Sequence, residues 1–180
     1  MKIRYLWCPV LLGFSQLQVH EHSEHLSRDA QFGGYEKWIK WIGNFHPIVL
    51  HFPIALIVMT VIAEILSLKS RSPIFKQAAR FMIIAAAITA LPTALFGLAY
   101  GYGASYEGTL IFVFWWHRFL GISTAVLAII TVVFKELHIR DKMGGRAYAI
   151  SLAFLFIFVT VTGYLGGEMT FGLFHLFPKL

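Results

Sequence analysis

Four long apolar segments constrain most strongly what this chain can fold into. They cover roughly residues 47–68, 78–100, 111–134 and 147–167, and each is close to the ~20 residues that a helix needs to cross a bilayer. Only 13% of the residues are charged and the mean hydropathy is +0.70, whereas about a quarter of the residues of a soluble domain are charged. Because lipid offers no hydrogen bonds, such segments must satisfy their backbones internally. The sequence therefore predicts an all-α membrane protein.

Basic residues mark two of the three connections between these segments. The first connection has no acidic residue and four basic ones: Lys69, Arg71, Lys76 and Arg80. The third has Glu136 and Asp141 against four basic ones: Lys135, Arg140, Lys142 and Arg146. The second has Glu107 and no Lys or Arg. Because basic connections stay in the cytoplasm, both termini are expected outside, and the short connections favour an up-down four-helix transmembrane bundle.

The chain before the bundle divides into three segments. Residues 1–15 have a basic start and a short apolar core, which is typical of a possible signal peptide. Residues 16–34 form a polar leader. Residues 35–45 carry apolar side chains at helical spacing, with two tryptophans, which predicts an interfacial helix at the membrane surface. Residues 46–176 then make up the four-helix transmembrane domain.

Histidines converge at one end of the predicted bundle. His46 and His51 open the first helix. His117 and Arg118 lie near the start of the third helix, and His175 follows the fourth. In an up-down bundle these positions share one side of the membrane. Ionisable residues at membrane depth are costly and mark functional sites, so we expect a shared site at the outer face.

The chemistry that these histidines suggest is axial ligation of haem b. Pro53 cannot complete the helical hydrogen-bond pattern, so the first helix should begin irregularly, with His51 aimed inward. A bis-histidine haem needs imidazoles on facing helices at matching depth. The expected iron ligands are His51 and His117, with His46 or His175 as alternates.

The neighbours of His117 allow two interpretations. Arg118 is placed to pair with a haem propionate, and Trp115, Trp116 and Phe119 to flank a porphyrin. Alternatively, Arg118 extends to the lipid headgroups, the tryptophans form an ordinary aromatic belt, and the histidines bond carbonyl groups that the nearby prolines leave free.

The polar leader contains a second candidate metal site: His20, His22 and His25. Their spacing can bind Zn, Cu or Ni, and a solvated leader without a rigid surrounding shell is the alternative. The chain has no basic cluster with interleaved aromatics, so no nucleic-acid partner is expected. It has no nucleophile triad, P-loop or dinucleotide motif. The sequence thus favours an electron carrier or accessory subunit over an enzyme.

Glu64 is an acidic residue within the first apolar segment, close to the first basic connection. One interpretation makes it part of a proton path. The other pairs it with a basic residue of the nearest connection, Lys69 or Arg80.

Three motifs along the chain are similar to those of one known family of membrane proteins. Residues 44–56, Asn-Phe-His-Pro-Ile-Val-Leu-His-Phe-Pro-Ile-Ala-Leu, are similar to its opening signature. The run His117-Arg118-x-x-Gly121 is similar to an internal element, and residues 162–168, Thr-Gly-Tyr-Leu-Gly-Gly-Glu, to its closing one. On these motifs the chain resembles the bacterial DUF2231 membrane proteins, and the resemblance covers roughly residues 44–175.

The resemblance implies a redox setting, because family members resemble parts or neighbours of membrane proteins with c-type cytochrome domains. His46, His51 and His117 carry over to matching positions. Tyr164 stands where the family often has histidine, and His175 has no expected counterpart, so a ligand from the fourth helix is not implied.

The leading hypothesis is therefore a haem b electron-transfer protein or redox-complex subunit. It would lie in the bacterial inner membrane, with both termini and its site periplasmic. Its partners would be membrane lipid and a c-type cytochrome or other redox subunits. The alternatives are a cofactor-free structural or accessory subunit, and a divalent metal-binding or transport protein.

Overall fold

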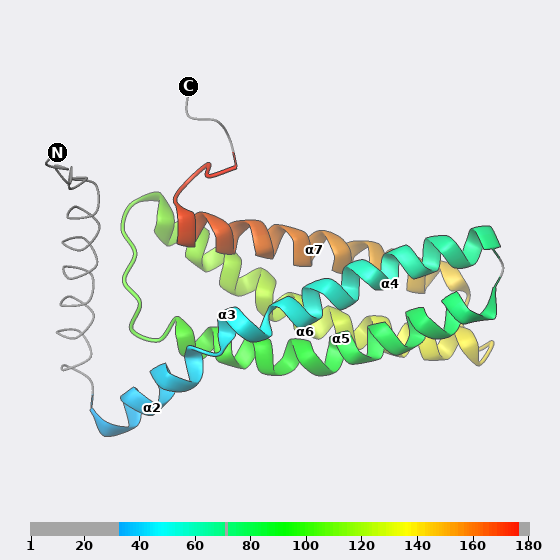
Figure 1. The fold of residues 1–180 in the computed structure, drawn as a ribbon, viewed down its shortest axis with the longest axis horizontal. Helices are drawn as coiled ribbons and strands as arrows, with labels where there is room; N and C mark the ends of the chain where they lie inside the picture. The colour runs from blue at the N-terminus through cyan, green and yellow to red at the C-terminus, as the bar shows by residue number, and fades with distance from the viewer. Residues whose placement is uncertain (1–32, 71, 177–180) are drawn as a thin grey trace, which may run out of the picture. The chain divides into compact units, whose positions relative to one another are not determined.

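The computed structural model describes residues 33–70 and 72–176. Regular structure in these residues is entirely helical (Figure 1): α2 (Gly34–Gly43), α3 (His46–Val49), α4 (His51–Ser70), α5 (Pro73–Tyr100), α6 (Thr109–Ile139) and α7 (Gly145–Phe171). This confirms the all-α prediction. The chain divides into two units, residues 1–39 and 40–180, and the second contains the four long helices. The possible signal peptide, nearly all of the polar leader and its three histidines lie outside the described residues.

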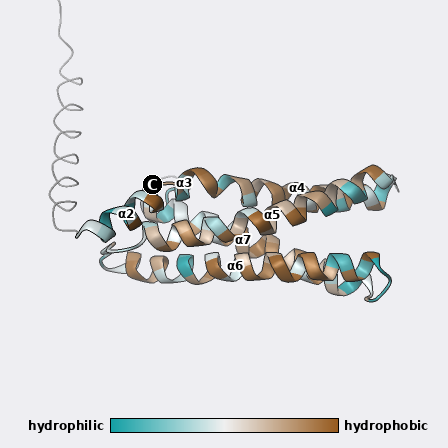
Figure 2. Ribbon diagram, turned by 90° about the horizontal axis from the view of Figure 1, so that it is seen from below, coloured by the Kyte–Doolittle hydropathy of each residue, from teal (hydrophilic) through white to brown (hydrophobic). Residues whose placement is uncertain are grey.

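Four helical stretches are long and apolar enough to cross a membrane, by length and composition: Gly34–Ser70, Pro73–Tyr100, Thr109–Ile139 and Gly145–Phe171. Their outward faces carry large apolar side chains, such as Phe81 (71% exposed) and Leu95 (64%). Figure 2 shows hydrophobic residues along the four helices and hydrophilic ones where α4 meets α5 and α6 meets α7. Lipid tails can surround such outward apolar faces, whereas water would not. The prediction of four spanning helices is therefore confirmed.

The helices extend further than their apolar segments. α5 begins at Pro73 rather than near residue 78, because Ser72 caps it by accepting a backbone N–H of the first turn at 3.4 Å. α6 continues to Ile139 rather than ending near residue 134. Arg80 and Lys135, expected in connections, therefore lie on helices and are available for contacts between them.

The first spanning stretch begins irregularly, as Pro53 predicts. The chain turns at Leu50 between α3 and α4, and the hydrogen bond from Ile54 to Leu50 is long, at 3.5 Å. His51 was expected to point inward, but it is exposed, whereas His46 is partly buried.

Small residues form much of the buried core, as expected for helices that pack closely without a hydrophobic driving force. The alanines among them are Ala63, Ala79, Ala86, Ala87, Ala90, Ala125 and Ala128. Gly43 lets the end of α2 approach the end of α5, because a Cβ there would lie 2.5 Å from the backbone nitrogen of Tyr100. Gly163 makes no such close approach, since nothing lies within 4 Å of the position of its missing Cβ.

The hairpins α4–α5 and α6–α7 repeat one pattern of residues. A fully buried threonine follows a histidine by 14 residues in each: Thr60 follows His46, and Thr131 follows His117. Both threonine hydroxyls donate to the backbone carbonyl four residues earlier, at 2.7 Å. The two hairpins thus use the same residue in the same way at equivalent depths.

Burial follows the same repeat. Residues of α6 lie 71 positions after their equivalents in α4, and residues of α7 lie 69 positions after those in α5. Buried positions correspond in this register: Ile57 with Ala128, Thr60 with Thr131, Ala79 with Tyr148, Ile83 with Leu152, Ala86 with Leu155, and Ala90 with Val159. Equivalent helices therefore turn equivalent faces into the core.

The order of packing places equivalent helices diagonally. α4 and α6 each contact both α5 and α7, and both hairpins begin at the same end of the bundle (Figure 1). An approximate twofold axis along the bundle therefore relates them, as in membrane proteins with parallel internal repeats. Equivalent inward side chains of α4 and α6 approach each other across this axis.

Two glycine substitutions test these contacts. Gly43→Ala should lower stability by about 1–3 kcal/mol, because its Cβ would overlap backbone atoms that cannot rotate away. Gly163→Ala should raise stability by up to ~1 kcal/mol, since the site is open and alanine favours helix. Thermal unfolding in mild detergent measures both changes. Equal effects of the two substitutions would contradict the close approach of α2 and α5.

Candidate functional site

His46 and His117 meet at the end of the bundle where α4 and α6 begin, which we call the histidine end. Their ring centres lie 6.4 Å apart, with an angle of 83° between the ring planes. Nδ1 of His46 lies 2.9 Å from the Thr93 carbonyl oxygen on α5, and Nδ1 of His117 lies 2.9 Å from the Thr162 carbonyl oxygen on α7. A carbonyl can only accept, so each Nδ1 carries the hydrogen. In the neutral imidazole, Nε2 is then the nitrogen with a free lone pair.

A glycine makes room for each histidine ring. A Cβ at Gly97 would lie 2.9 Å from Cε1 of His46, and a Cβ at Gly166 would lie 3.2 Å from Cε1 of His117. Each glycine follows the threonine that accepts the hydrogen bond by four residues, so it lies one helical turn further along. The two histidines therefore contact equivalent positions of α5 and α7, the second helices of the two repeats.

The structure pairs His117 with a different histidine from the one expected. His51 is exposed, and its Nδ1 lies 3.3 Å from the Ile48 carbonyl of its own segment. Its imidazole thus bonds the backbone locally. His46, expected only as an alternate, is the histidine whose ring contacts His117.

Three aromatic residues beside His117 in the sequence face away from the core. The guanidinium carbon of Arg118 lies 6.0 Å from the ring centre of Phe114, one turn earlier on α6. Trp115, Trp116 and Phe119 are 62%, 44% and 59% exposed. This arrangement matches an aromatic belt better than aromatic walls around a cofactor inside the bundle.

His175 packs against the end of α7. Glu168 is 3% exposed; its Oε2 accepts the Phe174 backbone N–H at 2.6 Å, and its Oε1 lies 3.3 Å from His175 Nδ1. The His175 ring stacks on Tyr164 with centres 6.0 Å apart, and a Cβ at Gly167 would lie 2.7 Å from its Cε1. These contacts hold the residues that follow α7 against the end of that helix. Among the described residues, the histidine ring that His117 contacts is His46 rather than His175.

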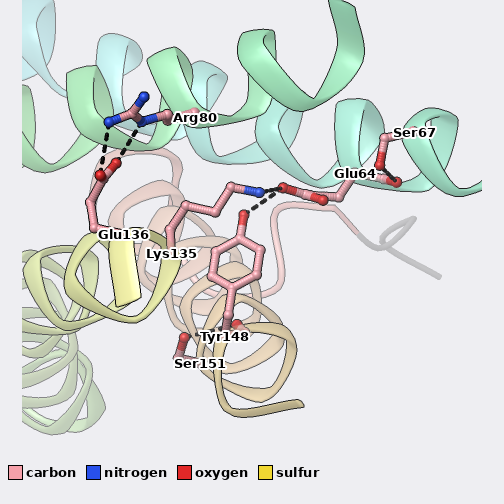
Figure 3. Close-up of polar contacts among 7 residues, drawn as sticks. All are labelled: Glu64, Ser67, Arg80, Lys135, Glu136, Tyr148 and Ser151. Carbon is pink, nitrogen blue, oxygen red and sulfur yellow. Dashed lines mark hydrogen bonds and ion pairs between the residues drawn. The ribbon is translucent and has the colours of Figure 1, made fainter. Parts of the chain in front are cut away.

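The opposite end of the bundle, with the two connections rich in Lys and Arg, is the basic end. Glu64 lies there as the acceptor for two side chains, as Figure 3 shows. Its Oε1 accepts from Lys135 Nζ at 2.5 Å and from the Tyr148 hydroxyl at 2.8 Å. Of the two expected partners, Arg80 instead binds Glu136, at 2.6 and 2.8 Å, and Lys69 forms no ion pair among the described residues. The partner comes from the diagonal helix because Lys135 faces inward, with only 6% of its side chain exposed.

Glu64 and Lys135 are equivalent positions of the repeat. Each follows its histidine by 18 residues, so both point toward the axis at the same depth. One position carries an acid and the other a base, and they meet as an ion pair. This spacing, together with the threonine–glycine spacing on α5 and α7, is the signal from which the contacts could have been found in the sequence.

Removing the charge of Glu64 should show how much an unpaired, buried Lys135 ammonium destabilises the protein. Glu64→Gln should lower stability by about 3 kcal/mol, because the Lys135 ammonium then lacks a carboxylate. Adding Lys135→Met should restore most of that loss, because it removes the unpaired cation. The new amide at position 64 can still accept the hydrogen bond from Tyr148. Glu136→Gln, at the more exposed Arg80 pair, is the control and should cost much less. Thermal unfolding is the measurement, and a Glu64→Gln loss no larger than the control would contradict this assignment.

Comparison with known proteins matches the chain to a family. No curated protein and no solved structure matches the chain. The family described as predicted membrane protein (DUF2231) matches residues 43–173. That range contains α4 to α7 together with His46 and His117. The chain therefore belongs to the DUF2231 family of predicted membrane proteins.

Proposed function

We propose that this chain is a membrane haem b protein that transfers electrons, with His46 and His117 as the two axial ligands. The observation that carries the proposal is the paired geometry of the two imidazoles. Each donates Nδ1–H to a helix carbonyl at 2.9 Å, which leaves Nε2 for a metal. Metal-binding histidines are oriented by such a hydrogen bond from the other ring nitrogen.

The spacing of the rings suits two imidazoles on opposite sides of one iron. With metal–nitrogen bonds of about 2 Å, their ring centres would lie roughly 6 Å apart. The ring centres of His46 and His117 are 6.4 Å apart. A bound haem would supply reversible one-electron chemistry, while the protein fixes ligand orientation and excludes water.

The number of protein ligands favours haem over a bare ion. A porphyrin provides four of the six donors of its iron, so two histidines suffice. A structural zinc site takes four ligands, nearly all from protein. Within residues 33–70 and 72–176, no group of three or more His, Cys, Asp or Glu side chains is placed to hold a metal ion.

The proposed setting follows from the charges of the basic end. The described basic residues there outside ion pairs are Lys69, Lys76, Arg140, Lys142 and Arg146. Positive charges favour the cytoplasmic side. We therefore place the histidine end at the periplasmic face of a bacterial inner membrane, where a c-type cytochrome or another redox subunit would exchange electrons with it.

A cofactor-free structural role is the second candidate, and the same hydrogen bonds favour it. The bond from His46 to Thr93 joins α3 to α5, and the bond from His117 to Thr162 joins α6 to α7. In that role Nδ1 matters and Nε2 does not. Both candidates need Nδ1, and they therefore differ in whether Nε2 is also essential.

Asparagine substitutions separate them. Asn places an N–H near the position of Nδ1 and has no counterpart of Nε2, so His46→Asn and His117→Asn should keep stability near wild type and lose haem. We would purify each protein in mild detergent after supplying haemin, then record iron content and a reduced-minus-oxidised visible spectrum. His51→Asn is the matched control and should keep the full Soret band.

Three outcomes are informative. No Soret band and no haem iron in the wild type would overturn the proposal. Full haem in both the His46 and the His117 variants would overturn the ligand assignment. Asn variants that match wild type in every respect, with no cofactor in any protein, would support the structural role.

A further inference from the structure

A groove runs between α4 and α7 at the basic end, away from the histidines. Its volume is about 820 Å³, and its apolar walls include Val61, Ile65 and Leu68 from α4 and Ala149, Ala153 and Ile157 from α7. Ile65 is 49% exposed and Ile157 is 52% exposed. The groove therefore opens onto the outer, membrane-facing surface of the bundle.

The internal repeat explains why the groove lies between these two helices. The equivalent seam, between α5 and α6, is bridged by Arg80 and Glu136 with hydrogen bonds of 2.6 and 2.8 Å. In the register of the repeat, Ala149 takes the place of Arg80 and Ile65 takes the place of Glu136. The α4–α7 seam thus lacks the long charged side chains that bridge its counterpart, and it remains open.

The charges that line the groove sum to a positive value. Glu64 and Lys135 at its floor neutralise each other. Lys76, from the first turns of α5, lines the groove and is exposed, and it belongs to no ion pair among the described residues. His138 also lines it and donates Nδ1–H to the Met143 carbonyl at 3.3 Å. The groove therefore combines apolar walls with an unneutralised cation.

We propose that this groove binds an anionic phospholipid, with an acyl chain between α4 and α7 and the phosphate beside Lys76. Hydrocarbon chains rather than water are available to fill apolar space at this depth. Anionic headgroups bind to basic pockets between spanning helices, and each basic side chain near the surface contributes about 1 kcal/mol. The proposal concerns the basic end and does not depend on haem at the other.

Native mass spectrometry of the full chain tests the charge. The protein would be exchanged into detergent containing equal amounts of phosphatidylglycerol and phosphatidylcholine. Wild type should retain one phosphatidylglycerol molecule in preference to phosphatidylcholine. Lys76→Gln should reduce the ratio of retained phosphatidylglycerol to phosphatidylcholine about fivefold. Lys142→Gln removes the same charge outside the groove and should change nothing. Equal retention of both lipids by wild type, or equal effects of the two substitutions, would overturn the proposal.

A second pair of variants tests the groove itself. Ala149→Phe places a ring in the groove and should abolish lipid retention. Ile150→Phe adds a ring at the next position of α7, which is 58% exposed and outside the groove, and retention should persist. Circular dichroism confirms that both variants keep their helices. Undiminished retention by Ala149→Phe would overturn the assignment.

Discussion

The contact of a histidine ring with a glycine of the neighbouring helix is the constraint on which the histidine end depends. Gly97 and Gly166 let the rings of His46 and His117 come so near that a Cβ would lie 2.9 and 3.2 Å away. That approach brings each Nδ1 to a threonine carbonyl. It thereby selects the tautomer and leaves Nε2 as the lone-pair nitrogen.

The internal repeat uses this architecture differently at its two ends. At the histidine end the equivalent residues that meet across the axis are both histidines, His46 and His117, as the proposed ligation of one metal requires. At the basic end the equivalent residues are Glu64 and Lys135, so the axis relates opposite charges, and they satisfy each other inside the bundle. The Arg80–Glu136 bridge has no counterpart on the other seam, which leaves the groove between α4 and α7.

The sequence was sufficient to predict the spanning helices, because hydropathy and segment length reflect the lipid environment directly. It was insufficient to tell which of His46 and His51 contacts His117, because the Pro47–Pro53 stretch interrupts the helix and its rotation cannot be deduced from spacing. It also missed the partner of Glu64, because inferring a diagonal contact requires knowing which helix faces are equivalent. The spacings of 14 and 18 residues after each histidine carry that information, once the two hairpins are aligned.

The central claim is that His46 and His117 share one metal. Iron X-ray absorption spectroscopy of the haem-loaded protein tests it most directly, because imidazole ligands give a distinct scattering pattern beyond that of the porphyrin. Wild type should show two axial imidazoles, and any haem iron that His46→Asn or His117→Asn still retains should show fewer than two. Unchanged imidazole scattering in either variant would contradict the claim.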